Sequence, residues 1–64
     1  MITTADKLHC VERELGYRRR VYDRLVCRGK MTELHARREI ALMEAIAEDY
    51  RAVLAQQVPQ LKLG

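Results

Sequence analysis

The feature that most constrains the fold of this chain is one short break, Gly29-Lys30-Met31, between two long stretches that contain no proline. On each side of the break, apolar residues recur every three or four positions, the spacing that places side chains on one face of an α-helix. So short a connection allows only antiparallel neighbours. The sequence therefore predicts an all-α fold: a two-helix antiparallel hairpin over residues 1–58, with helices at about 4–28 and 32–57, and a short C-terminal tail at 59–64.

Residues at the predicted helix ends support these bounds. Thr3 is a suitable N-cap, and Asp6 follows it by three positions, as in a capping box. Gly29 provides the left-handed residue that commonly ends a helix, and Thr32 is a suitable N-cap for the second helix. Pro59 cannot continue the second helix, which is expected to end just before it.

The apolar positions define a predicted core. In an antiparallel hairpin with this turn, residues whose numbers add up to about 60 face each other, so that Leu15 meets Ile46. The apolar arc of the second helix spans about 160°, wider than one neighbouring helix covers. Because so short a chain also forms only a small core, we expect a homodimer, an antiparallel four-helix bundle. The predicted hairpin and dimer core comprises Leu8, Val11, Leu15, Tyr22, Leu25, Ile40, Met43, Ile46, Tyr50, Val53 and Leu54.

Three consecutive arginines, Arg18 to Arg20, stand in the middle of the first predicted helix. Successive helix residues point about 100° apart, so the three cannot form one patch. Arg18 falls inside the apolar stripe, where a charge needs a partner, and Glu14 and Glu39 are candidates. Two interpretations stay open: Arg18 forms an ion pair at the helix seam, or it is kept free for a ligand.

The other basic residues follow a different face. The net charge is +3, and residues 1–30 carry eight Lys/Arg against four Asp/Glu, whereas residues 31–64 carry four against five. Three roles are possible for this face: a solvated surface, a contact with an acidic protein, or a contact with phosphates. Tyr17 lies at its edge and could anchor a partner. The candidate partner-binding residues are Arg13, Tyr17, Arg20, Arg24, Arg28, Lys30, Arg37 and Arg38.

Several classes of function are disfavoured. The chain has no serine, no glycine-rich phosphate loop and no histidine with an orienting carboxylate at helical spacing, so we expect no catalytic residue and no cofactor. Cys10 and Cys27 would lie about 25 Å apart on one helix, too far for a disulfide. His9 and His35 are too isolated for a zinc site. No apolar run approaches a membrane span, and "MITTADKLHC" is unlike a signal peptide, so we expect a soluble, cytoplasmic protein.

Two strings, "RRRVYDRLVCRGKMT" and "ARREIALMEAIAEDY", carry a resemblance. The chain resembles a family of short proteins of proteobacterial temperate phages and prophages. The family pattern is Arg-x-Val-Tyr, then Val-x-x-Gly-(Lys/Arg)-Met, then Ala-x-x-x-Ile-x-x-Met-x-x-Ile-x-x-Asp-Tyr. Relatives often have proline after the first tyrosine, where this chain has Asp23, so no kink is expected there. The matching residues are Arg19, Val21, Tyr22, Val26, Gly29, Lys30, Met31, Ala36, Ile40, Met43, Ile46, Asp49 and Tyr50.

What the resemblance implies is a function by protein binding. The group includes, or lies close to, a phage quorum-sensing anti-activator of Pseudomonas phages, a small helical dimer. That protein binds a LuxR-type transcription activator and is linked to the type IV pilus assembly ATPase. We therefore expect a cytoplasmic homodimer that sequesters a host protein, most readily a transcription regulator. Two alternatives remain: a nucleic-acid-associated phage protein that uses the basic hairpin tip, and a purely structural helical dimer.

Overall fold

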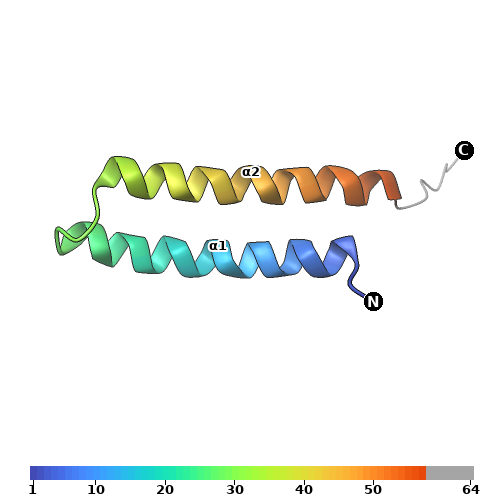
Figure 1. Ribbon diagram of the computed structural model, residues 1–64, viewed down its shortest axis with the longest axis horizontal. Helices are drawn as coiled ribbons and strands as arrows, with labels where there is room; N and C mark the ends of the chain where they lie inside the picture. Colours follow the sequence, from blue (N-terminus) through green and yellow to red (C-terminus); the bar gives the residue numbers. More distant parts are fainter. Residues whose placement is uncertain (58–64) are drawn as a thin grey trace, which may run out of the picture.

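The computed structural model describes residues 1–57 as two long helices that lie side by side and run in opposite directions (Figure 1). Helix α1 spans Thr4–Cys27 and helix α2 spans Glu33–Gln57. The predicted helical hairpin is confirmed, and each helix bound lies within one residue of the expected one. The described residues contain no strand. The predicted tail at 59–64 lies outside them.

The N-terminus of α1 is closed by a capping box. The Asp6 backbone N–H donates to Thr3 Oγ1 over 3.1 Å, and the Thr3 backbone N–H donates to Asp6 Oδ2 over 3.0 Å. Two backbone donors that the helix leaves without partners are thereby satisfied. The hydrogen bond from the Thr3 backbone, helped by the one with the Thr3 side chain, holds the pKa of the Asp6 carboxyl below its usual value.

The turn has the hydrogen bonds of a Schellman motif. The Lys30 N–H donates to the Leu25 carbonyl over 2.8 Å, and the Gly29 N–H donates to the Val26 carbonyl over 3.0 Å. Gly29 adopts the left-handed conformation, with φ at 70°. This conformation reverses the chain within a few residues, and the Thr32 hydroxyl then accepts from a backbone N–H in the first turn of α2. The local chemistry of residues 25–32 thus fixes the two helices as antiparallel neighbours.

The hairpin is a single layer with a thin core. Among the described residues, Leu15, Ala36 and Ala47 are the only buried ones. Most predicted core residues are half-buried: Leu8, Val11, Tyr22, Leu25, Ile40, Met43, Tyr50 and Leu54. Ile46 and Val53, also in the predicted core, remain 41% and 42% exposed. One hairpin therefore covers only part of the apolar surface that the sequence provides.

Candidate interaction surfaces

Arg18 belongs to a charged cluster at the seam between the helices. Its Nε lies 3.1 Å from Glu14 Oε2, one turn earlier on α1, and its Nη1 lies 3.7 Å from Glu39 Oε1 on α2. The guanidinium carbon is 6.0 Å from the centroid of the Tyr22 ring. The two carboxylates expected from the sequence are its partners. Arg18 is therefore occupied within the hairpin, as the seam interpretation requires.

Two further ion pairs between the helices were not foreseen from the sequence. Arg19 Nη2 lies 2.6 Å from Glu44 Oε2, and Arg51 Nη2 lies 2.8 Å from Glu12 Oε2. Both pairs lie on the same side of the hairpin, because their members are seven residues apart on each helix. Residue numbers in the three cross-helix pairs add up to 57 or 63, on either side of the expected 60. Opposite charges at about this register are the signal in the sequence that could have indicated both pairs.

The side that carries the Arg18 cluster also carries three exposed apolar residues of α2. Leu42, Ile46 and Val53 follow Glu39 at steps of three, four and seven, so the four residues share one arc of the helix. The three apolar side chains are 45%, 41% and 42% exposed. We call this side, with Leu42, Ile46, Val53 and the Arg18 cluster, the apolar face. Apolar side chains left uncovered in a row indicate a contact surface.

A separate strip of arginines runs along the outside of α1. Arg13, Arg20, Arg24 and Arg28 are all exposed, and Tyr17 beside them is 53% exposed. We call these five residues the basic ridge. Within residues 1–57, Arg20, Arg24 and Arg28 form no ion pair, and the guanidinium of Arg13 contacts only Cys10 Sγ, at 3.9 Å. The ridge arginines thus differ from Arg18 and Arg19, whose charges are neutralised inside the hairpin.

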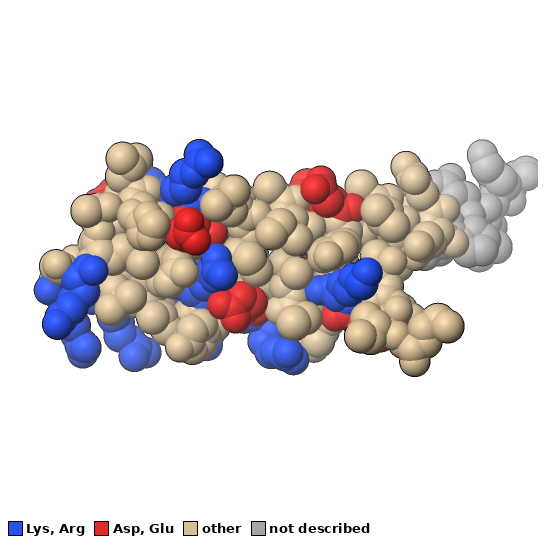
Figure 2. Space-filling model, in the orientation of Figure 1, with Lys and Arg blue, Asp and Glu red and all other residues tan. Residues whose placement is uncertain are grey.

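The turn extends the basic character to one end of the molecule. Lys30 and Arg38 are exposed, whereas Arg37 forms an ion pair with Glu33 on its own helix. The hairpin brings residues 18–42 together in its turn-side half, with eight Lys/Arg against three Asp/Glu, a formal charge of +5. The other half of the described hairpin, residues 1–17 and 43–57, carries three against six, a formal charge of −3. Figure 2 shows the basic side chains gathered at the end where Figure 1 places the turn.

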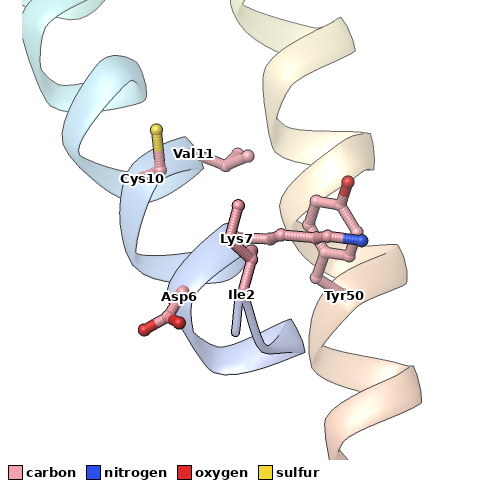
Figure 3. Close-up of a pocket in the computed structure, with 6 residues that line it drawn as sticks. All are labelled: Ile2, Asp6, Lys7, Cys10, Val11 and Tyr50. Carbon is pink, nitrogen blue, oxygen red and sulfur yellow. The ribbon is translucent and has the colours of Figure 1, made fainter.

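An open cavity of about 540 Å³ lies at the opposite end, between the first turns of α1 and the middle of the second half of α2. Its lining is mostly apolar and consists of Ile2, Asp6, Lys7, Cys10, Val11 and Tyr50. In Figure 3, the Lys7 side chain extends from α1 toward Tyr50, while the Asp6 carboxylate points away from α2. Ile2 precedes α1, and the other lining residues belong to α1 and α2. Among residues 1–57, nothing else covers this hollow, which is open at this end of the hairpin.

Other site types find little support in the part of the chain that the structure describes. Cys10 and Cys27 both lie on α1, are exposed and are not bonded to each other. Residues 1–57 hold no group of three His, Cys, Asp or Glu side chains placed to bind a metal ion. Neither described helix is long and apolar enough to cross a membrane.

Comparison with models of known protein families, with curated proteins and with solved structures finds no match for this chain. The described residues offer three candidate functional features: the basic ridge, the apolar face and the charge difference between the two ends.

Proposed function

We propose that this protein is a dimeric binding module that captures an acidic surface of a host protein through the basic ridge. The observation that carries the proposal is the division among the arginines. Arg18, Arg19 and Arg51 each form an ion pair with a carboxylate of the neighbouring helix. Arg20 and Arg24 form none within residues 1–57, although carboxylates are plentiful in this chain. Unneutralised arginines beside an exposed tyrosine make a surface of the kind that protein interfaces use.

The resemblance to small phage proteins supports a transcription regulator as the partner, of the LuxR type, in the cytoplasm of the bacterial host. A pilus assembly ATPase is a second partner by the same resemblance. The ridge arginines at positions 20, 24 and 28 are four residues apart and form one strip along α1. Such a strip complements an acidic groove, and the long-range field of the +5 half would speed the encounter with it.

The apolar face provides the dimer in this proposal. A charged ridge needs a rigid support, and a hairpin with three buried residues is a weak one. Pairing two hairpins through Leu42, Ile46 and Val53 would build a four-helix core. It would leave the outer arginines of the ridge, Arg13, Arg20 and Arg24, exposed in each copy. Two ridges on one particle would also allow divalent capture of a dimeric regulator, which raises the apparent affinity without new contacts.

The test is capture of host proteins by an immobilised ridge variant. Arg20→Gln with Arg24→Gln removes two charges from the ridge without touching an ion pair, so the fold should be kept. The matched control, Ala41→Glu with Ala45→Glu, lowers the net charge by the same amount on an exposed part of α2. Wild type and control should enrich the same regulator from host lysate, identified by mass spectrometry, and the ridge variant should lose it at least ~10-fold. Equal enrichment by all three proteins would show that the ridge is a solvated surface and does not bind the partner.

A nucleic-acid role is the rival, because unpaired arginines also suit phosphates. Tyr17 is the one aromatic residue on the ridge, which gives little scope for stacking on bases. Binding to a DNA duplex at several salt concentrations separates the two functions. Phosphate contacts release counterions, so the rival requires an affinity that falls steeply as salt rises. Negligible duplex binding at physiological salt, with capture that survives nuclease treatment, supports the protein partner.

A further inference from the structure

We infer that the apolar face binds a second copy of this chain in an antiparallel arrangement, with the turn end of each hairpin over the open end of the other. This inference rests on the proposed dimer and adds its orientation and register. The twofold axis would pass close to the Arg18 cluster, near the middle of the hairpin. Three observations carry the inference: the extent of the apolar face, the charge difference between the ends, and the position of the cavity.

A second copy fits the apolar face in length and composition. The exposed apolar residues run from Leu42 to Val53, over a large part of α2, and no other described segment of the chain covers them. A self-complementary partner must offer the same face with the same charged cluster in it, and another hairpin does so by symmetry. Covering Ile46 and its neighbours would turn half-buried side chains into a core that one hairpin lacks.

Charge decides between the two possible orientations. With both turns at the same end, the two turn-side halves, each of charge +5, would lie against each other. In the antiparallel arrangement each of these halves lies against the −3 half of the other copy. Opposite charges then meet along the whole bundle, and the strongly basic tips stay about a helix length apart.

The cavity at the open end favours the same orientation. Val21 continues the line of Glu14 and Arg18 toward the turn, at steps of three and four, and it is half-buried. Val21 and the cavity residue Tyr50 lie at about equal distances from the middle of the hairpin, on opposite sides of it. In an antiparallel dimer centred on the twofold axis, Val21 of one copy therefore covers the cavity beside Tyr50 of the other. A parallel dimer would instead place two open cavities opposite each other.

The Arg18 cluster would set the register. Glu14 and Arg18 lie on either side of the middle of α1, whose bounds are Thr4–Cys27. Across a twofold axis at this point, Glu14 of one copy lies level with Arg18 of the other. A slip of one turn, about 5.4 Å, would bring like charges together. A polar residue within a helix seam commonly fixes register and orientation in this way.

Distances between spin labels test the orientation. Two variants each carry one cysteine for the label: the native Cys27 after Cys10→Ser, or position 9 after Cys10→Ser, Cys27→Ser and His9→Cys. Cys27 and His9 are both exposed, whereas Cys10 lines the cavity that the second copy would cover. Residues 9 and 27 are five helical turns apart, so the two labels point in the same direction. In the antiparallel dimer, the two Cys27 labels should lie about 35 Å apart along the bundle and the two labels at position 9 about 20 Å apart. In a parallel dimer both pairs would lie at similar distances, within about one bundle width of 20–25 Å. Because both labels point in the same direction, the length of the labels largely cancels in the difference between the two variants, which should be about 15 Å.

The outcomes separate the dimer from its orientation. A monomer mass by light scattering at micromolar concentration would overturn the dimer and this inference with it. A dimer mass with similar distances at positions 9 and 27 would keep the dimer and overturn the antiparallel arrangement. For the register, Arg18→Met should add a second population to the Cys27 distances. Arg19→Met, which removes the 2.6 Å pair with Glu44 on the other side of the hairpin, should leave them unchanged. A single unchanged distance in Arg18→Met would show that the cluster does not set the register.

Discussion

Arg18 and its neighbour Arg19 show how burial separates the roles of two adjacent residues. The Arg18 side chain is 25% exposed and contacts two carboxylates and a tyrosine ring. The Arg19 side chain is 55% exposed and has one partner, Glu44, which is itself half-exposed. Water screens the second pair more, so its contribution to stability is small, whereas the first lies at a packed seam. One residue step on a helix thus separates an internal structural contact from a surface one.

The two glycines within residues 1–57 predict opposite effects for the same substitution. Gly29 has φ at 70°, and a Cβ there would meet nothing within 4 Å, so Gly29→Ala carries a purely conformational cost. We expect it to lower the free energy of unfolding by about 1–2 kcal/mol. Gly16 lies inside α1, and its Cβ would make an ordinary contact with Arg20 at 3.9 Å. Gly16→Ala should therefore raise the free energy of unfolding by about 0.5–1 kcal/mol.

Urea denaturation followed by far-UV circular dichroism, at one protein concentration, measures both variants. Two shifts of the same sign would contradict this account of the turn, because they would mean that backbone conformation at Gly29 is not what distinguishes the two sites.

The partners of Arg18 were predictable from the sequence on both helices, because a charge inside the apolar stripe needs a neighbouring carboxylate, whereas the exposed ion pairs between the helices were missed. Glu39 was expected from its place on the apolar arc of α2. Glu14 was a foreseeable partner of Arg18 because four residues on a helix make one turn. Arg19 with Glu44 and Arg51 with Glu12 require the register between helices, which periodicity gives only to within a few residues. The sequence also could not separate ridge arginines from paired ones, since both kinds follow helical spacing.

At the scale of the helix, the capping box gives α1 a dependence on pH. The pKa of Asp6 is lowered in the folded chain, mainly because the Thr3 N–H donates to its carboxylate. The contribution to stability is therefore fully present above the unfolded pKa of 3.8 and is lost as the pH falls through the lower folded value. Asp6→Asn should be less stable than wild type at neutral pH, and the two should converge in strong acid.

Thermal unfolding of both proteins across the acid range checks this expectation. Thr32→Ala removes the uncharged cap of α2 and should lower the free energy of unfolding by about 1 kcal/mol. Its stability should not converge with that of wild type in strong acid. A stability gap between Asp6→Asn and wild type that stays constant down to the lowest pH would show that the carboxylate charge does not matter for the cap.

The helices themselves were predictable because their signals are local and agree with one another. Caps, proline-free length and apolar spacing all indicate the same bounds near Thr4 and Gln57. Burial within the hairpin was less predictable. Ala36 and Ala47 are more buried than any large aliphatic residue of α2, at 6% and 0% exposed. Small side chains let the two helices approach closely, and the large residues beside them are left at the edge of the contact between the helices. Apolar spacing alone does not predict this edge position.

At the scale of the whole molecule, the described hairpin leaves much of its apolar surface uncovered. Its inner side is held by alanines and by Leu15, whereas Leu42, Ile46 and Val53 lie on the apolar face, still 41–45% exposed. A single aliphatic residue exposed to this degree is common, but three in one arc beside a seam ion pair are not. Function would follow from the same division. The apolar face would join the copies, and the outer arginines of the basic ridge, Arg13, Arg20 and Arg24, would remain free for a partner.

Ile46→Asp is the substitution that tests this division most directly. It puts a carboxylate in the middle of the apolar face, where a second copy would bury it without a partner, and an unpaired buried charge is costly. We expect the dissociation constant of the dimer to rise at least ~100-fold, which corresponds to about 2.7 kcal/mol. Ala41→Asp puts the same group on an exposed position of α2 away from this arc and should leave the dimer intact.

Sedimentation over a range of protein concentrations reads the association directly, and thermal unfolding gives a second measure. The melting temperature of a homodimer rises with concentration, because association stabilises the folded state by mass action. Wild type and Ala41→Asp should show this dependence, and Ile46→Asp should lose it while melting at a lower temperature. If Ile46→Asp sedimented as a dimer with an unchanged dissociation constant, the apolar face would not be where the copies meet. A single hairpin would then carry the ridge without a second copy on its apolar face. Among the described residues, the only large buried side chain of this hairpin is Leu15.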